Sequence, residues 1–345
     1  MSEGYLTPSK DALFKTRNYI FLKRNENKMT IYFVFQHVYT TFALKSEQKH
    51  KKGIMNLSGR RESSNVEDRR GMSTGAKAGI GGIAGIIIIA LMTFMQGGSL
   101  GDVVTNVVQQ GGLSAIQEEQ VEGQREFTEE EQELAKFSRQ VLASTEDVWT
   151  KVFKQMGKTY TPPTLVLFTN SVSSACGEAS ASVGPFYCSG DQKLYIDLSF
   201  FTDMKKQLGA DGDFSYAYVI AHEVGHHVEN LLGTLNAAHT QMNKVNQVEA
   251  NKISVRLELL ADYYAGVWGH YENAAYGSLE TGDIEEAIDC AEKIGDNYLQ
   301  KKARGYVQPE SFTHGTSAQR MRWLKRGLET GDMNISTFNV RESEL

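Results

Sequence analysis

The pattern of hydrophobic positions changes along the chain, and the change divides it into segments. Residues 78–95, AGIGGIAGIIIIALMTFM, form an uncharged apolar run. Residues 128–345 instead alternate short apolar and polar stretches, first at the spacing of a helix, then at that of strands and then again at that of helices. Residues 97–127 are rich in glycine and then in acidic residues, as a linker would be. The pattern predicts one globular domain over 128–345, preceded by a separate apolar segment.

In the predicted domain, a few strands come before a series of helices. Thr128 and Glu131 make a capping box for a first helix, which Pro162-Pro163 separates from the strand TLVLF. Two more strands are predicted at 186–188 and 194–198. A sheet followed by helices indicates an α+β fold that is mainly helical with a small β-sheet. Five more helices are predicted. The first is capped by Ser199 and ends at Gly209, the second is capped by Asp213 and ends at Gly233, and the third covers 235–271. The fourth starts at Asp283, which forms a capping box with Glu286, and the fifth starts with the capping box Thr316-x-x-Gln319 and ends at Gly331.

The apolar run is about long enough to cross a bilayer, so we predict a single transmembrane helix over residues 78–96. Its glycines would be costly in a soluble helix and are commoner in membrane helices. The alternatives are a buried core helix and a cleavable signal peptide, although no A-x-A-like cleavage site follows the run. Gly81 and Gly85 have the spacing of a helix-dimer face, so a homodimer stays open, although in so glycine-rich a segment coincidence is the favoured explanation.

Flanking charge predicts the orientation of this anchor. Arginines and a lysine precede the run, at 60, 61, 69, 70 and 77, whereas the first charges after it are acidic. The positive-inside rule then makes residues 55–77 a cytoplasmic segment, too poor in apolar residues to fold alone. The predicted location is the cytoplasmic (inner) membrane, with a single crossing and the C-terminal domain periplasmic or extracellular.

Net charge and cysteine content limit which partners and which cellular compartment the sequence is compatible with. A formal net charge of -6 argues against nucleic acid as the main partner. Cys176 and Cys188 are close in sequence and could pair in an exported domain, while Cys290 lies in a helical run and has the pattern of a buried free thiol.

Residues 1–54 fit neither a helix nor a strand pattern convincingly. Lys52-Gly53 must be encoded by AAR-GGN, a purine-rich string that resembles a bacterial ribosome-binding site just before the Met55 codon. Our hypothesis is that translation starts at Met55 and that residues 1–54 are an over-extension of the gene. The alternative is a genuine, weakly ordered cytoplasmic extension.

The strongest chemical signal is the run AHEVGHH inside an apolar helix. At about 100° per residue, His222 and His226 fall about 40° apart on one face and can share a metal ion. Glu223 is placed to act on metal-bound water rather than to bind the metal. His227 lies about 140° from His222 and is a poor candidate. The alternative without a metal is a helix with two surface histidines.

A zinc site needs a third protein ligand. The metzincin pattern is excluded because Leu232 stands where its third histidine would be, and Glu229 lies a further turn away from the pair. Glu258 and Asp262, four residues apart in an apolar helix, need a compensating cation. We expect Glu258 to bind the metal and Asp262 to accept a hydrogen bond from the histidine N–H that faces away from the metal. One alternative is that the two residues exchange these roles. Another is that they form an acidic stripe on a solvated helix face, without a metal.

Five segments of the chain resemble one known family. HEVGHH followed by ELLAD is similar to the HExxH and ExxxD arrangement of gluzincin metallopeptidases. The match is closer to the bacterial family described as "putative neutral zinc metallopeptidases", and it covers Met55 to about Asp332, the apolar run included. The resemblance implies a membrane-anchored, zincin-like metallopeptidase domain that binds Zn²⁺, in a family that begins at the residue corresponding to Met55. The segments that carry it are GRRESSNVEDRRG, ACGEASASVGPFYC with LYIDLSFF, AHEVGHHVENLLG, LELLADYYAGVWGH and THGTSAQRMRWLKRGLETGD.

The predicted chemistry is hydrolysis of a peptide bond in a polypeptide substrate. Glu223 is the expected general base, and His314, in a loop before the last helix, is the first choice for stabilising the oxyanion. Further candidates for that role are Tyr263, Tyr264 and His270. The strand at 194–198 either pairs with extended substrate at a sheet edge or lies inside the sheet. The rival interpretation is a catalytically silent, membrane-tethered binding or assembly protein with a structural metal site. Ligand type alone also admits a divalent metal other than zinc.

Overall fold

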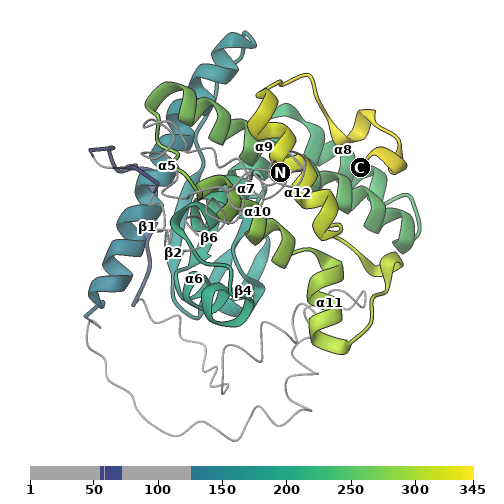
Figure 1. Ribbon diagram of the computed structural model, residues 1–345, viewed down its shortest axis with the longest axis horizontal. Helices are drawn as coiled ribbons and strands as arrows, with labels where there is room; N and C mark the ends of the chain where they lie inside the picture. The colour runs from purple at the N-terminus through teal and green to yellow at the C-terminus, as the bar shows by residue number, and fades with distance from the viewer. Residues whose placement is uncertain (1–54, 58, 72–125) are drawn as a thin grey trace, which may run out of the picture. The chain divides into compact units, whose positions relative to one another are not determined.

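The computed structural model describes residues 55–57, 59–71 and 126–345 (Figure 1). These residues all belong to one unit, Gly53–Leu345. The predicted anchor over 78–96 lies outside the described residues, as do residues 1–54. Within the described ranges, no helix combines the length and the apolar character that a membrane crossing requires.

A four-stranded sheet has the order β1-β2-β6-β5. β1 and β6 flank β2 in parallel, and β5 closes one edge antiparallel to β6. The strand predicted near 194–198 is therefore internal, which rules out its use as an edge for substrate. A separate hairpin, β3 with β4, was not predicted and neither was β1. The strands are β1 Val66–Asp68, β2 Thr164–Phe168, β3 Ser171–Ser174, β4 Gly177–Ser180, β5 Phe186–Cys188 and β6 Lys193–Asp197.

Both faces of the sheet are buried. Leu165 and Leu167 of β2 belong to the main core under the helices, while Val166 and Phe168 belong to a second cluster with Val172 of the hairpin. Successive side chains of a strand point to opposite faces, so this alternation gives each face its own apolar layer. After the partly buried Thr164, the residues LVLF of β2 are all apolar because neither side of this strand meets water.

The rest of the described chain is mainly helical, as predicted. The expected helix over 235–271 is two helices, because the chain turns at residues 243–246 and the Asn246 side chain caps the second one by accepting from the Glu249 N–H. The helices are α5 Glu129–Gln155, α6 Ser199–Asp203, a π-helical turn Met204–Leu208, α7 Asp213–Leu232, α8 Thr234–Met242, α9 Gln247–Tyr276, α10 Asp283–Lys293, α11 Asp296–Arg304 and α12 Ser317–Thr330, with 3-10 turns at Ala181–Val183, Pro309–Ser311, Thr337–Asn339 and Glu342–Glu344.

Two predicted capping boxes are confirmed, Thr128 with Glu131 and Thr316 with Gln319. The predicted stops Gly209, Gly233 and Gly331 all adopt left-handed backbone. Three predicted N-caps are wrong by one position, because Ser199, Asp213 and Asp283 are each the first residue of their helix. The caps of the latter two are Gly212 and Gly282, whose φ angles of 125° and 107° favour glycine.

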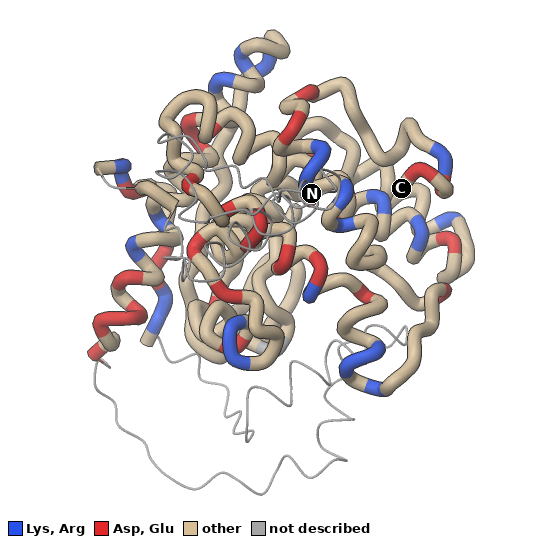
Figure 2. The backbone as a smooth tube through the Cα atoms, viewed as in Figure 1, with Lys and Arg blue, Asp and Glu red and all other residues tan. Residues whose placement is uncertain are grey.

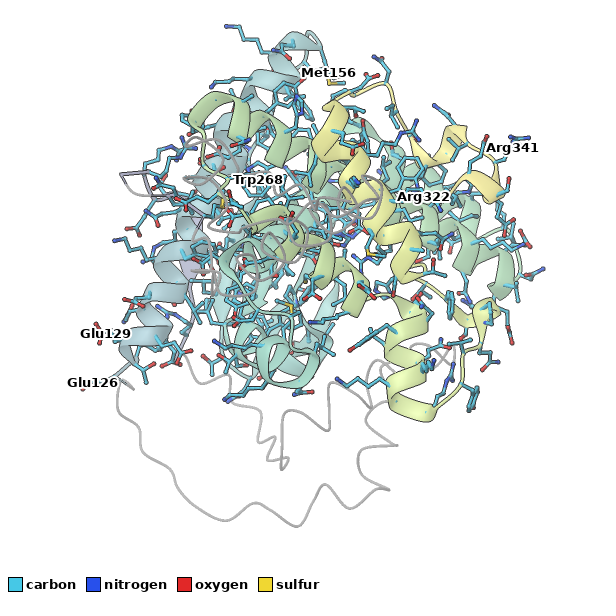
Figure 3. The ribbon with its side chains drawn as sticks, in the orientation of Figure 1. Glu126, Glu129, Met156, Trp268, Arg322 and Arg341 are labelled. Atoms are coloured by element: carbon cyan, nitrogen blue, oxygen red, sulfur yellow. A yellow bond between two sulfur atoms is a disulfide. The ribbon has the colours of Figure 1, made fainter. Side chains whose placement is uncertain are left out.

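α9 lies at the centre of the helical layer, between α7 and α12. A Cβ on Gly225 of α7 would lie 2.8 Å from the Ala261 carbonyl oxygen of α9, and one on Gly266 would lie 2.8 Å from Gly327 Cα of α12. Small residues therefore let the three helices approach closely. Figure 3 shows Trp268, which is fully buried, among the packed side chains, whereas Glu129 lies at the outer end of α5.

Residues 55–71, predicted as a polar segment outside the globular domain, are part of it. β1 extends the sheet, and Met55 and Leu57 are 2% and 5% exposed within the main core. Figure 2 shows basic residues of this segment beside acidic residues of α5. The segment is stabilised by the domain rather than by apolar residues of its own.

Candidate metal centre

The buried face of α7 presents the two motif histidines to the same point. The ring centroids of His222 and His226 are 4.8 Å apart, one helical turn from each other. Their side chains are 10% and 14% exposed, so solvent or substrate can reach them. Glu223, between them in sequence, is 7% exposed.

Glu258 comes to this point from α9. Its two carboxylate oxygens lie 3.2 Å from His222 Nε2 and 3.6 Å from His226 Nε2. One ligand atom from each of the three side chains falls within 4.8 Å of the others, a group able to hold a metal ion. Two imidazole nitrogens and a carboxylate oxygen are donors that zinc accepts in catalytic sites. The donor set and its convergence therefore fit the predicted ion.

Asp262 does not join this group of atoms. It lies on the other side of the His222 ring, where Nδ1–H donates to Oδ1 over 2.8 Å. Its carboxylate therefore fixes the tautomer that leaves Nε2 free to bind a metal. Of the two assignments left open by the sequence, the geometry favours Glu258 as ligand and Asp262 as the partner of His222.

His226 has an equivalent partner that the sequence analysis did not find. Its Nδ1–H donates to Glu229 Oε2 over 2.9 Å. Glu229 is fully buried, and its Oε1 has no hydrogen-bond partner among the described residues. The sequence prediction that Glu229 is too distant to be a ligand agrees with this geometry. The spacing i to i+3 from His226 was the available signal for the contact.

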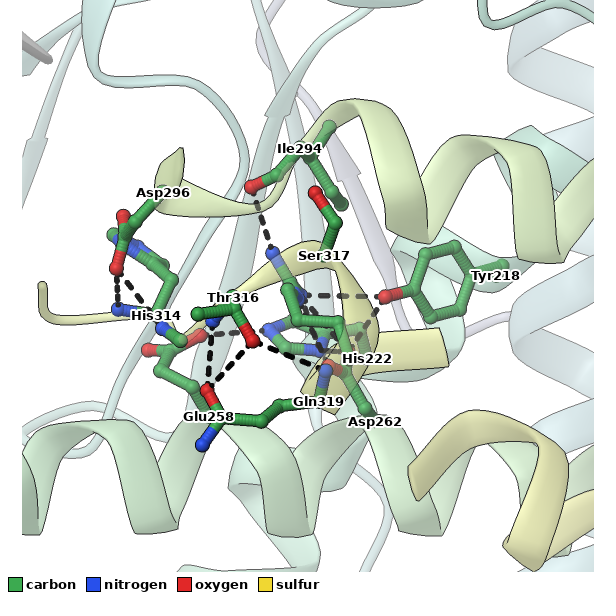
Figure 4. Close-up of polar contacts among 12 residues, drawn as sticks. Tyr218, His222, Glu258, Asp262, Ile294, Asp296, His314, Thr316, Ser317 and Gln319 are labelled. Carbon is green, nitrogen blue, oxygen red and sulfur yellow. Dashed lines mark hydrogen bonds and ion pairs between the residues drawn. The ribbon is translucent and has the colours of Figure 1, made fainter. Parts of the chain in front are cut away.

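Arg320 of α12 was also missed. Its Nε and Nη2 donate to Asp262 Oδ2 and Oδ1, each over 2.8 Å, and Tyr218 Oη donates to Oδ1 over 2.6 Å (Figure 4). Arg320 is 3% exposed and Asp262 is fully buried. A usable signal existed in the sequence, because Arg320 shares the apolar stripe of its helix with Trp323, Leu324 and Gly327.

The charged groups of the cluster shift one another's pKa values. Burial opposes ionisation of Glu258, yet His314, His226 and His222 hold the pKa of its carboxyl well below the usual range. Burial alone would lower the pKa of His226, but Glu258 and Glu229 raise it to about 10. The site therefore has a strong preference for positive charge beside its carboxylates, as a cation site requires.

Burial raises the pKa of Glu223, although both motif histidines oppose that shift. Its carboxylate therefore binds a proton more readily than an exposed glutamate does. A general base in a peptidase has to take a proton from water and release it again, so this shift suits the predicted role.

His314 lies in the loop before α12, close to Glu258 (Figure 4). Asp296 holds this loop in place, because its Oδ2 accepts the backbone N–H groups of Thr313, His314 and Gly315 over 2.7–2.9 Å. Asp296 Oδ1 also lies 3.4 Å from His314 Nδ1. Burial lowers the pKa of His314, but Glu258 and Asp296 raise it to about 9. The side chain is 40% exposed, so it can meet a ligand.

The other candidates for oxyanion stabilisation have different contacts. Tyr263 Oη donates to the Asp332 carbonyl over 2.7 Å, and His270 Nδ1–H donates to the Leu328 carbonyl over 2.9 Å. Tyr264 packs edge-on against Trp149, with ring centroids 5.7 Å apart. Tyr263 and His270 thus hold α9 to the end of α12 rather than facing the histidine pair.

His227 points away from the cluster, toward the sheet. Its Nε2–H donates to the Thr161 carbonyl over 2.7 Å, and its Nδ1 accepts from Tyr187 Oη over 3.0 Å. Accepting a hydrogen bond at Nδ1 requires a neutral ring, and burial lowers its pKa to about 4. The third histidine of the run therefore fastens α7 to β5.

The cysteines are arranged as the sequence analysis expected. Cys176 and Cys188 form a disulfide that joins the turn of the β3–β4 hairpin to β5. Cys290 is a buried free thiol, and burial raises its pKa to about 12.

The profile of the family described as "Putative neutral zinc metallopeptidase" matches residues 55–338. The chain belongs to this family. It is 46% identical over 284 residues to the uncharacterized protein YpfJ of Escherichia coli strain K12, an alignment that covers 81% of this chain and 96% of the relative. It is 40% identical over 202 residues to the uncharacterized protein Rv2575 of Mycobacterium tuberculosis strain H37Rv, which covers 55% of this chain and 67% of the relative. No solved structure matches the chain.

Proposed function

We propose that this member of the family is a zinc-dependent peptidase that hydrolyses peptide bonds inside polypeptides. The observation that carries the proposal is the convergence of one ligand atom each from His222, His226 and Glu258 within 4.8 Å, beside the buried carboxylate of Glu223. His222, His226 and Glu258 would hold a zinc ion, which would supply Lewis acidity and lower the pKa of the attacking water.

Other residues of the chain transfer the proton and position the metal ligands. Glu223 takes the proton from the attacking water and passes it to the leaving amine, which its raised pKa favours. Asp262 and Glu229 hold the two imidazole rings by their Nδ1–H groups, so that each Nε2 keeps its direction. Arg320 in turn holds Asp262 ionised and in place.

His314 is the proposed donor to the developing oxyanion of the substrate. Asp296 fixes the loop that carries it; burial lowers the pKa of the ring, whereas Glu258 and Asp296 raise it, which favours the protonated form. A protonated imidazole beside a developing negative charge stabilises the transition state more than the substrate.

The proposed location is outside the cytoplasm at the bacterial inner membrane, with a polypeptide as substrate. The disulfide Cys176–Cys188 supports an oxidising compartment. The net charge of -6 gives no support to nucleic acid as a partner. Membrane attachment through residues 78–96, and a homodimer through Gly81 and Gly85, stay predictions of the sequence.

The test compares the wild-type chain with Glu223→Gln, using an unfolded protein as substrate and elemental analysis for zinc. We expect hydrolysis to fall at least about 100-fold, because general base catalysis contributes about that much or more. Zinc content should stay at about one ion per chain, since Glu223 is not a ligand. If the wild type binds zinc but hydrolyses nothing, and the variant keeps full biological activity, the tethered binding or assembly protein is the better interpretation.

A further inference from the structure

The segment 59–71 is joined to the globular domain by ion pairs that range from buried to half-exposed. Arg60 Nη2 lies 3.3 Å from Asp147 Oδ2 and 3.3 Å from Glu272 Oε2, and its guanidinium stacks 3.7 Å over the Tyr276 ring. Arg61 Nη2 lies 2.8 Å from Glu146 and 2.8 Å from Asp147. These arginines therefore already have their counter-charges within the domain.

Polar side chains complete the same contact. Ser63 Oγ and Asn65 Nδ2 donate to Glu146 Oε1 over 2.5 and 2.7 Å. Glu146 is 5% exposed and Glu272 is fully buried. If the segment were elsewhere, these carboxylates would lose their arginine partners while remaining in the interior, which is strongly unfavourable.

The backbone of the segment continues the sheet. β1 pairs in parallel with β2 from Val66 opposite Leu165 to Asp68 opposite Leu167. The Leu165 N–H donates to the Asn65 carbonyl over 2.9 Å, and the Arg69 N–H donates to the Leu167 carbonyl over 2.8 Å. Without β1, the central strand β2 would become an edge with unpaired backbone groups.

We propose that residues 55–71 lie on the same side of the membrane as residues 126–345. A sheet cannot have neighbouring strands in two compartments. A single crossing between residues 71 and 126 would put β1 and β2 on opposite sides of the bilayer, which their pairing excludes. This inference replaces the single-crossing topology that flanking charge predicted. It does not depend on the proposed peptidase activity.

Most of the basic residues that predicted a single crossing are partnered within the folded domain. The prediction used Lys77, outside the described residues, and the arginines at 60, 61, 69 and 70 as free cytoplasmic charges. Arg60 and Arg61 are partnered by the domain as described, Arg69 lies beside Glu67, and Arg70 Nη2 lies 2.6 Å from Asp68 with its guanidinium over Phe127. The disulfide Cys176–Cys188 indicates that the shared side is oxidising.

The experiment places one cysteine on each side of the apolar run in the full-length chain. Glu62→Cys reports on the N-terminal segment and Glu329→Cys on α12, at side chains that are 40% and 62% exposed. Each variant is expressed in Escherichia coli, and spheroplasts are treated with a membrane-impermeant maleimide. Detergent-opened cells give full labelling, and a cytoplasmic protein controls for leakage.

We expect both cysteines to be labelled in intact spheroplasts. Protection of both would still support one shared side but would place the domain in the cytoplasm, against the proposed location. Labelling of one and protection of the other would overturn the inference, because it is the pattern of a single crossing.

A second measurement tests whether β1 is docked in the purified full-length chain. Arg69→Pro removes the N–H that donates to the Leu167 carbonyl, whereas Arg69→Ala keeps it and loses only the side chain. We expect the proline variant to melt several degrees lower than the alanine variant. Equal melting temperatures would show that β1 is not part of the folded domain.

Discussion

Arg320 binds both carboxylate oxygens of Asp262, and through Asp262 it reaches the Nδ1 side of His222. The three residues come from α12, α9 and α7, so one buried ion pair joins all three helices that surround the candidate metal site. Charge-assisted, two-point contacts of this kind are among the strongest hydrogen bonds in proteins.

Replacing Arg320 with Gln should weaken both folding and metal binding. The buried Asp262 carboxylate would keep only neutral donors and the histidine, which costs about 3–5 kcal/mol of unfolding free energy. Zinc affinity should fall about 10- to 100-fold, the usual effect of disturbing a ligand's partner. Chelator competition measures the affinity, and urea unfolding measures the stability. Arg326→Gln, on the same helix but stacked over Trp323, is the matched control and should keep zinc affinity.

Glu229→Gln should lower zinc affinity without lowering the stability of the zinc-free protein. Gln can still accept the His226 Nδ1–H, but the fully buried charge with its unpartnered Oε1 is gone. We expect zinc affinity to fall about 10-fold, because the carboxylate no longer raises the basicity of the ring. The zinc-free protein should be at least as stable as the wild type at about pH 8, where burial of the charge is costly. A clear loss of zinc-free stability would mean that Glu229 is chiefly a structural residue.

His227 should make the zinc-free protein sensitive to acid. In the unfolded chain its pKa is about 6.5, whereas burial lowers it to about 4 in the folded protein. The unfolded state therefore binds a proton first, and this contribution to stability is full above about pH 6.5. It is lost progressively as the pH falls toward about 4, by roughly 3 kcal/mol.

The measurement is urea unfolding of the wild type and of His227→Gln in EDTA at several pH values. Effects of the other titrating groups cancel in the difference between the two proteins. We expect the variant to lose less stability between about pH 6.5 and about pH 4. Parallel curves would contradict the assignment of a neutral, buried His227.

Gly225→Ala should force α7 away from α9. The new Cβ would lie 2.8 Å from the Ala261 carbonyl oxygen and 2.9 Å from Ala261 Cα, and backbone cannot yield as a flexible side chain does. Overpacking of this kind costs about 1–3 kcal/mol. Since His222 and His226 move with α7, zinc affinity should also fall.

The matched control for that substitution is Gly277→Ala at the end of α9. Among the described residues, no atom would lie within 4 Å of the added Cβ, but the φ of 61° at this position is left-handed. The substitution should therefore cost roughly 1 kcal/mol of stability and leave zinc binding unchanged. If both variants bind zinc as the wild type does, close packing of α7 on α9 does not set the geometry of the site.

The helices and the metal cluster could be predicted because their signals are local. Capping boxes at Thr128 and Thr316 lie within one turn, and His222 and His226 share a face by helical periodicity alone. Glu258 and Asp262 were found as a pair of carboxylates in an apolar run. Which of them faces Nε2 depends on how α9 lies against α7, and sequence spacing does not contain that information.

The contacts that were missed join residues far apart in the chain. β1 has a single apolar residue, Val66, and its strand conformation is stabilised by pairing with Leu165 and its neighbours. Arg320 lies 58 residues from Asp262. The apolar stripe of α12 marks the side of the helix that is buried, but which carboxylate Arg320 meets there depends on how α12 packs against α9.

The position of Arg320 in α12, near the C-terminal end of the chain, has a consequence for synthesis of the protein. A nascent chain that has reached Asp262 has made every residue of the metal cluster, yet its buried carboxylate still has no guanidinium partner. The site reaches its final form only when α12 leaves the ribosome or the export channel. The metal affinity that depends on Arg320 would then be complete only at the end of synthesis.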